Sequence, residues 1–127
     1  MIVLDASVLI AHFDGGDVHH ARATALLAGA PGEAKAASLL TLSEVLVGPA
    51  RAGRLDHAIS VLDQLQILTQ HLPSDAPVRL ALLRAETSLK LPDCCVLLAA
   101  EQTGAALATF DHRLAGAAKQ RGLVLLD

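Results

Sequence analysis

Short apolar runs and stretches of helical spacing alternate along the chain. The strand-like runs, which are apolar or rich in β-branched residues, fall at residues 2–4, 36–40, 66–72, 105–109 and 123–126. Between them, apolar side chains recur every three or four positions, which is typical of helices with one buried face. The pattern predicts strands that alternate with helices along the sequence.

Glycines and capping side chains set the expected bounds of the first helices. Residues 8–10 form an apolar helical turn, and the glycine pair at 15–16 breaks it. Asp17 can cap the next helix, which we expect to run to about residue 28, because its carboxylate accepts hydrogen bonds from free backbone N–H groups.

A longer helical segment follows the second predicted strand. Thr41 or Ser43 starts this helix, and we expect an interruption near residues 48–49 because proline removes a helix hydrogen bond. A separate helix is then expected over about residues 55–65.

An apolar stripe marks the helix that Ser74 or Asp75 caps. We expect the stripe to face the core, with a dimer face as the alternative. Its members are Val78, Ala81, Leu82, Ala85 and Leu89.

The last helices have clear boundary residues. Pro92 opens a helix that Gly104 stops, and Asp111 caps a final helix to about residue 120. Strands alternating with helices indicate a largely parallel sheet covered on both faces. We therefore predict one α/β domain over residues 1–127, with three α/β/α layers and a central, mostly parallel five-stranded sheet.

Composition excludes several classes of protein. With 53% hydrophobic residues the chain is not disordered, and with 2% aromatic residues a platform of stacked rings for nucleic acid is improbable, since only Phe13 and Phe110 could stack. The net charge of −3 argues against a broad basic surface. The adjacent Cys94 and Cys95 suit neither a disulfide framework nor a zinc site, so we expect them in the core.

The sequence also bears on location. No apolar run reaches the roughly 18–20 residues that a membrane span needs. The first residues enter a strand without a basic leader or cleavage site, so we expect a cytoplasmic protein without membrane contact.

Four acidic residues are expected at one edge of the sheet. Asp5 ends the first strand, Glu44 lies in the first turn after the second, and Asp111 follows the fourth. Asp93 begins a helix of about 18 Å, which is close to the length of the strand after it, so it should reach the same edge. In such folds, ligands usually bind beyond the carboxyl ends of the parallel strands.

Clustered carboxylates repel one another and favour a bound cation. Two unit charges about 4 Å apart oppose folding by about 4 kcal/mol at an effective dielectric of 20. Oxygen ligands favour Mg²⁺ or Mn²⁺, which can activate water for attack on a phosphodiester. Without the four acids the net charge of −3 becomes +1, so a metal-loaded edge could admit a phosphate backbone.

Each acid also has a structural interpretation. Asp93 and Asp111 lie where carboxylates cap helices, and Glu44 could pair with Thr41 in a capping box. Asp5 ends a buried strand, where an unpaired carboxylate is costly, so a functional role is favoured there.

Weaker candidates surround the acids. Ser7 could orient Asp5 or cap a helix, and Thr109 is similar. Arg113 and Arg51 are candidates for contacts with phosphate, although most helical arginines are solvated. The histidines share no ligand spacing, and we assign none to catalysis.

Four segments together resemble the PIN-domain ribonucleases, and among them the VapC-like toxins of toxin-antitoxin modules. The segments are MIVLDASVLIA, TLSEVLVG, LPDCCVLLAAEQTG and ALATFDHRL. The resemblance places the family's catalytic acids at Asp5, Glu44, Asp93 and Asp111, with Asp5, Asp93 and Asp111 on the metal and with Ser7 and Thr109 in support. Cys94, Cys95, Leu97 and Leu98 depart from the family's common pattern, which affects packing and not the ligands.

The resemblance also implies an activity and partners. It implies a Mg²⁺- or Mn²⁺-dependent endoribonuclease that is commonly a homodimer. A VapB-like antitoxin would silence it, and operator DNA would be contacted only through that antitoxin.

Three other functions remain open. A phospho-accepting receiver has a similar size, but it needs an acidic pair where Asp5 stands alone, and a haloacid-dehalogenase-like phosphatase needs an acid at Ser7. A non-catalytic module of the same fold, which only binds a partner protein, is the other alternative.

Overall fold

The computed structural model describes residues 1–29 and 31–126. Its elements in chain order are β1 (Ile2–Leu4), α1 (Ala6–Phe13), α2 (His20–Ala28), β2 (Lys35–Ser38), α3 (Leu39–Arg51), α4 (Leu55–Gln64), β3 (Ile67–Gln70), α5 (Ala76–Thr87), α6 (Leu91–Thr103), β4 (Ala106–Ala108), α7 (His112–Gln120) and β5 (Leu125–Leu126). The predicted alternation of strands and helices is confirmed, β1 has its predicted bounds, and the other four strands are shorter than predicted.

The five strands form one sheet in the order β3-β2-β1-β4-β5, and every neighbouring pair is parallel. From β1 the chain builds the sheet outward through β2 to β3, and it then returns to add β4 and β5 on the other side. The order therefore reverses between β1 and β4. Ligands of open parallel sheets bind at such a reversal, beyond the carboxyl ends of the strands.

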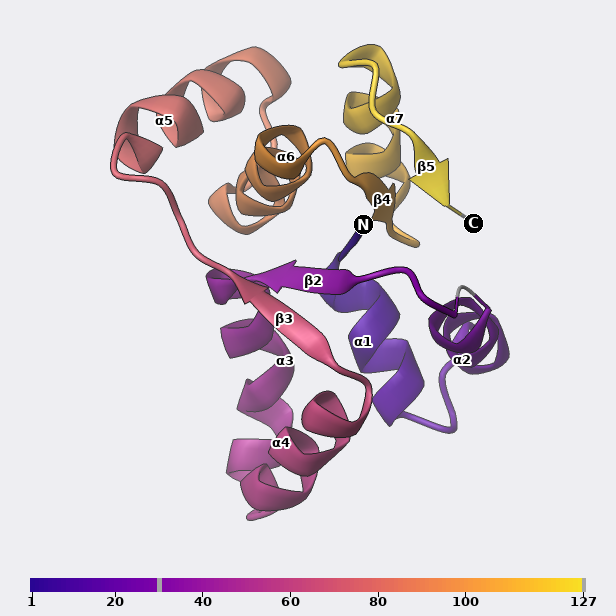
Figure 1. Cartoon of the computed structure of the whole chain (residues 1–127). Helices are drawn as coiled ribbons and strands as arrows, with labels where there is room; N and C mark the ends of the chain where they lie inside the picture. Colours follow the sequence, from indigo (N-terminus) through magenta and orange to yellow (C-terminus); the bar gives the residue numbers. More distant parts are fainter. Residues whose placement is uncertain (30, 127) are drawn as a thin grey trace.

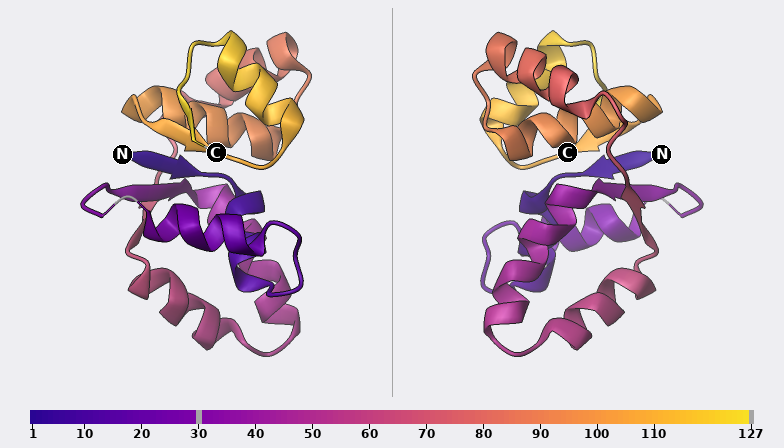
Figure 2. Two further views of the ribbon diagram at one scale, coloured as in Figure 1. Left: turned by 90° about the vertical axis from the view of Figure 1, so that its right-hand side faces the viewer. Right: turned by 90° about the vertical axis from the view of Figure 1, so that its left-hand side faces the viewer.

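Helices cover both faces of the sheet. Figures 1 and 2 show α5, α6 and α7 on one side and α1 to α4 on the other. Successive side chains of a strand point to opposite faces, so Val3 packs with α5–α7 while Ile2 and Leu4 pack with α1–α4. The predicted three-layer α/β/α fold is confirmed.

Helix α6 is buried along most of its length. Every residue from Cys94 to Ala100 is buried among α5, α7 and the sheet. Cys94 and Cys95 are free thiols in this core, as predicted, and burial raises the pKa of both. Gly104 ends the helix with a φ of +67°, a left-handed conformation that glycine adopts without strain.

The second strand ends earlier than predicted. Leu39 and Leu40, which we expected in this strand, form the first turn of α3 and are 48% and 36% exposed. Ser38 occupies the N-cap position in place of Thr41 or Ser43. An apolar pair does not distinguish the end of a strand from the start of a helix.

Helix α3 is not interrupted at the Gly-Pro pair. It continues through Pro49 to Arg51. Proline removes a single N–H donor, and at this position it does so in the last turn, where the helix is about to end. The following backbone is held by Arg54, whose N–H donates to the carbonyl of Pro49 over 2.8 Å.

Four of the five residues of the predicted stripe are exposed, and the fifth, Leu89, is buried in the core just beyond the end of α5. Val78 and Leu82 are 64% and 57% exposed, whereas Ala76 and Leu83 are buried and Leu80 packs against the core. Both faces of this helix carry apolar residues, so periodicity alone selected the wrong one.

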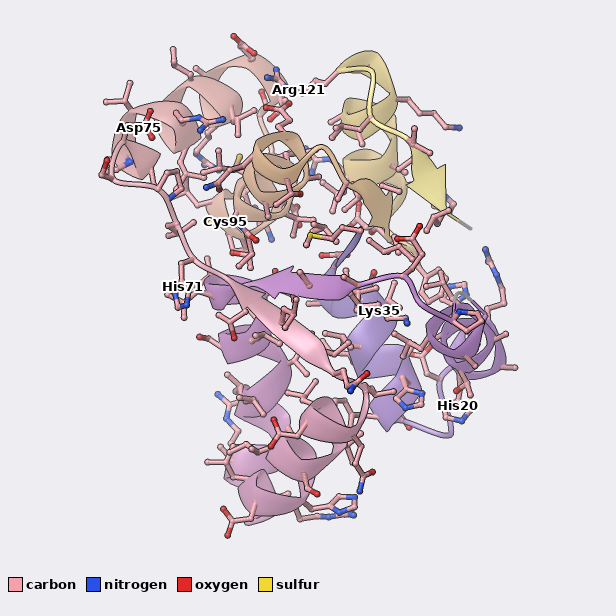
Figure 3. The ribbon with its side chains drawn as sticks, in the orientation of Figure 1. His20, Lys35, His71, Asp75, Cys95 and Arg121 are labelled. Atoms are coloured by element: carbon pink, nitrogen blue, oxygen red, sulfur yellow. The ribbon has the colours of Figure 1, made fainter. Side chains whose placement is uncertain are left out.

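Two further observations complete the fold. Arg121, which follows α7, pairs with Glu86 of α5 and Glu101 of α6, and Figure 3 shows it between these helices. Within residues 1–29 and 31–126, no helix combines the length and the apolar character needed to cross a membrane.

Candidate active site

Asp5 is a buried carboxylate at the point where the strand order reverses. It follows β1 at the N-cap position of α1, is 6% exposed and makes no capping hydrogen bond. Instead, its Oδ2 accepts hydrogen bonds from Ser7 Oγ over 2.7 Å and Thr109 Oγ1 over 2.8 Å. The two hydroxyls fix the carboxylate against the end of β4.

The backbone after β4 orients these two hydroxyls. The N–H of Phe110 donates to Ser7 Oγ over 3.0 Å, and the N–H of Asp111 donates to Thr109 Oγ1 over 3.0 Å. Each hydroxyl thus accepts one backbone N–H and directs its own hydrogen to Asp5. Ser7 lies inside α1 and does not cap it, which excludes the capping alternative.

Glu44 and Asp93 carry raised pKa values. Burial raises the pKa of Glu44 first, and the charges of Asp5 and Asp93 raise it further. Burial likewise raises the pKa of Asp93, with further contributions from Asp5 and Asp111. The carboxylates of Asp5 and Asp111 therefore lie close enough to Glu44 or Asp93 for their charges to raise the pKa of these two side chains.

The structural alternatives for the acids can now be separated. Oδ1 of Asp111 accepts the N–H groups of Arg113 and Leu114, both over 2.9 Å, so Asp111 does cap α7. Asp93 does not cap α6, because Lys90 occupies that position, but it lies in the first turn of α6, where the helix dipole favours a carboxylate.

Glu44 also has no capping role. Thr41, its expected partner in a capping box, lies inside α3, and the capping position belongs to Ser38. The raised pKa of Glu44, which lies among like charges, therefore has no explanation in helix capping.

The two candidate arginines differ in position. Arg113, in the first turn of α7, lies near enough to Asp93 to offset part of the rise in its pKa, as does Lys90. Arg51 lies in the last turn of α3, seven residues beyond Glu44 and so about 10 Å along the helix. The structure brings Arg113 to the acids and leaves Arg51 at a distance.

The acidic residues suit a divalent ion in charge and donor type. Their oxygens are the ligands that Mg²⁺ and Mn²⁺ prefer, and the ion pairs of the described residues include none of the four acids. In the part of the chain that the structure describes, no three Asp, Glu, His or Cys side chains stand close enough to form a ready-made metal cage. Mg²⁺ commonly binds one or two carboxylates and keeps several waters, which this arrangement allows.

Two features beside the acids were not predicted. Glu44 borders a cavity of about 350 Å³ between α1, α3 and α4, whose lining includes Phe13, Val45 and Ala58. His19 and Arg22 of the α2 region lie against the ring of Phe110. The sequence predicted a helix that starts near Asp17, but no sequence pattern linked the start of this helix to Phe110.

Comparison with known proteins decides the family. The family model described as the PIN domain matches residues 2–120. The chain belongs to the PIN-domain family. Among curated proteins, none matches the chain significantly.

Solved structures with this PIN fold include components of toxin-antitoxin systems. The chain is 28% identical to one in a toxin-antitoxin complex from Klebsiella pneumoniae, with a TM-score of 0.75 and 87% of both chains covered. It is 18% identical to VapC20 of Mycobacterium tuberculosis, a Sarcin-Ricin loop cleaving toxin, with a TM-score of 0.71 over 98% of this chain and 97% of that one.

A third structure is VapBC2 from Rickettsia felis bound to a DNA fragment from their promoter. The chain is 18% identical to it, with a TM-score of 0.70 over 99% of this chain and 98% of that one. The fold of this PIN domain is thus that of VapC-type toxins.

The PIN fold also excludes one of the rival functions. Receiver domains have the strand order 2-1-3-4-5, whereas this sheet has the order 3-2-1-4-5. The receiver hypothesis is therefore wrong on topology.

Proposed function

We propose that this protein is a metal-dependent endoribonuclease toxin that hydrolyses RNA phosphodiester bonds. The observation that carries the proposal is the gathering of Asp5, Glu44 and Asp93 at the strand-order reversal, where burial and mutual repulsion raise the pKa of the latter two. The PIN-domain match and the RNA-cleaving neighbour VapC20 support the same activity.

Each acidic residue has a distinct part in this proposal. Asp5, held by Ser7 and Thr109, would be the fixed ligand of Mg²⁺ or Mn²⁺, with Asp93 and Asp111 completing the ion's surroundings through direct or water-mediated contacts. The bound ion would supply an activated water and stabilise the charge that develops on the phosphate. Glu44 would orient the attacking water.

Arginine contacts would position the RNA backbone. Arg113 stands beside Asp93, where its guanidinium can meet a phosphate entering the site. Arg51 is the weaker candidate, because its position at the end of α3 suits a phosphate further along the strand.

An antitoxin partner is the second part of the proposal. The Klebsiella and Rickettsia neighbours come from toxin-antitoxin assemblies, and the cavity beside Glu44 has a largely apolar lining suited to a partner's side chain. A VapB-like antitoxin seated there would close the approach to the acids. Binding of operator DNA would occur through the antitoxin.

A homodimer is the third part. The exposed apolar residues Val78 and Leu82 of α5 provide a face that a second copy could cover. Sedimentation of the purified protein tests this, and a monomer at all concentrations contradicts it.

The activity is tested by RNA cleavage with EDTA and with Mg²⁺ or Mn²⁺ restored. We expect cleavage only with metal, and a loss of at least about 100-fold in Asp5→Asn and Asp93→Asn, which exceeds the usual effect of removing an outer partner of a ligand. Asp75→Asn is the matched control, because Asp75 occupies the N-cap position of α5 but makes no side-chain capping hydrogen bond. Full metal-dependent activity in Asp93→Asn would refute the assignment.

The antitoxin is tested genetically. Expression of the wild-type chain should arrest growth, Asp93→Asn should not, and co-expression of a small neighbouring open reading frame should restore growth. Purified toxin that cuts no RNA but still binds that partner would favour the non-catalytic module.

A further inference from the structure

Three side chains form a stacked group beside the acidic residues. The imidazole of His19 lies on the ring of Phe110, with centroids 4.6 Å apart and planes inclined by 25°. The guanidinium carbon of Arg22 lies 5.1 Å from the centroid of the same ring. We call His19, Arg22 and Phe110 the stacked triad.

The backbone connects the stacked triad to the active site. Phe110 stands between Thr109, which bonds Asp5, and Asp111, which caps α7. Its own N–H donates to Ser7, the other hydroxyl on Asp5. Phe110 is therefore the next residue in sequence after Thr109, whose hydroxyl holds the carboxylate of Asp5, and its backbone bonds the other hydroxyl that does so.

Hydrogen bonds hold the start of α2 in place. The N–H of His19 donates to Asp17 over 2.8 Å, and Nδ1 of His20 donates to the carbonyl of Ala11 over 2.9 Å. His20, labelled in Figure 3, joins α2 to α1 in this way. The triad is thus part of a fixed surface and not a free loop.

The charge of Arg22 is uncompensated within the described chain. Arg22 is exposed, and the ion pairs of residues 1–29 and 31–126 do not include it. Arginine held on an aromatic ring presents a planar cation that binds phosphate or stacks on a base. A cation in this place would attract an anionic ligand that has to approach the acidic residues.

We propose that the stacked triad binds the RNA strand immediately beside the scissile phosphate. Arg22 contacts a backbone phosphate, the outer face of His19 stacks on the flanking base, and Phe110 positions both. Single-stranded RNA is commonly bound by a base stacked on an aromatic side chain together with a basic contact to its backbone. The inference rests on the proposed ribonuclease function and adds the residues that hold its substrate.

Binding of a short fluorescein-labelled single-stranded RNA tests the triad. The measurements use the full chain with Asp93→Asn, so that the RNA stays intact, in Mg²⁺ and at several salt concentrations. We expect Arg22→Gln to weaken binding and to reduce the slope of log K against log[salt] by about 0.7, the value for one lost phosphate contact on a single strand.

The other two members have different expected effects. His19→Ala, measured at pH 8, should weaken binding about fivefold or more without changing the slope, because a stacked base carries no counterion. Phe110→Leu keeps an apolar side chain but removes the ring, and it should weaken binding and lower the slope together.

A structural role and a binding role give different results. Lys119→Gln, at the far end of α7, is the control for charge, and melting temperatures are measured for every variant. If the triad only fastens α2, the variants lower the melting temperature and match the control in affinity and slope, which overturns the inference alone. If the parent protein binds no RNA, both the inference and the proposed substrate fail.

Discussion

The hydroxyl of Thr109 donates a 2.8 Å hydrogen bond to Oδ2 of Asp5, joining the ends of β4 and β1 where the strand order of the sheet reverses. The two residues are 104 positions apart in sequence. The hydroxyl of Ser7 donates to the same oxygen, so both of these hydrogen bonds are made to Oδ2.

Thr109→Val removes this donor while keeping the shape of the side chain. We expect Mn²⁺ affinity and cleavage to fall about 10- to 100-fold, the usual effect of removing an outer partner of a metal ligand, with a stability loss of about 1 kcal/mol. Calorimetric titration with Mn²⁺ measures the affinity. Thr103→Val is the control, because that hydroxyl only bonds the carbonyl of Ala99 within α6. Equal Mn²⁺ affinity in wild type and Thr109→Val would contradict the role of Thr109.

Neutralising an active-site acid should stabilise the metal-free protein. In EDTA, Glu44→Gln removes a carboxyl group whose pKa is raised by burial and by the charges of Asp5 and Asp93. We expect the melting temperature to rise by about 2 °C, since solvent screening at this exposed residue keeps the gain below about 1 kcal/mol. A fall in melting temperature would show that Glu44 is favourable in the unliganded fold.

The same repulsion predicts how stability depends on pH. Glu44 and Asp93 have folded-state pKa values above their ordinary values, so the unfolded chain releases their protons first as pH rises. Their contribution to stability is complete below the ordinary values of about 4 and is lost as pH rises through the raised folded-state values. Denaturant titrations in EDTA should show this loss, and it should shrink in the double variant Glu44→Gln with Asp93→Asn. An equal loss in that variant would assign the effect to other groups.

The two cysteines should resist thiol reagents in the native state. Cys94 and Cys95 are buried in α6 and their pKa values are raised, so little reactive thiolate reaches solvent. Labelling with a disulfide reagent should be slow in buffer and should give both thiols at once in denaturant. Rapid labelling of the native protein would mean that α6 opens locally.

Sequence reasoning predicted the arrangement of the acids because it rests on local signals and one topological rule. Residues 2–4 and 105–109 have strand character, Gly104 and Asp111 mark helix ends, and parallel strands share one edge. These features place Asp5, Asp93 and Asp111 at one edge of the sheet without any knowledge of packing.

The errors arose where two arrangements satisfy the same pattern. Leu39 and Leu40 are equally apolar in a strand or a helical turn, and both faces of α5 carry apolar side chains. Pro49 is tolerated because it falls in the last turn of its helix. These choices are decided by tertiary contacts, which local sequence does not record.

The stacking on Phe110 could not be predicted for a related reason. It depends on how α2 lies across the end of the sheet, a position set by contacts such as that of His20 with Ala11. The distances between the carboxylate oxygens could not be predicted either. Spacing places the acids at one edge of the sheet, but it does not fix how closely their oxygens approach.

The unbroken burial of Cys94 to Ala100 within α6 has a consequence for how this protein tolerates variation. From Cys94 to Ala100 there is no solvent-facing position at which one side chain can replace another at little cost. In a library that substitutes each position in turn, cellular abundance should fall across an unbroken block in α6, without the three-to-four-residue rhythm expected for the half-exposed α5. Because that block reflects volume and not chemistry, it should persist when the library is built on an inactive parent.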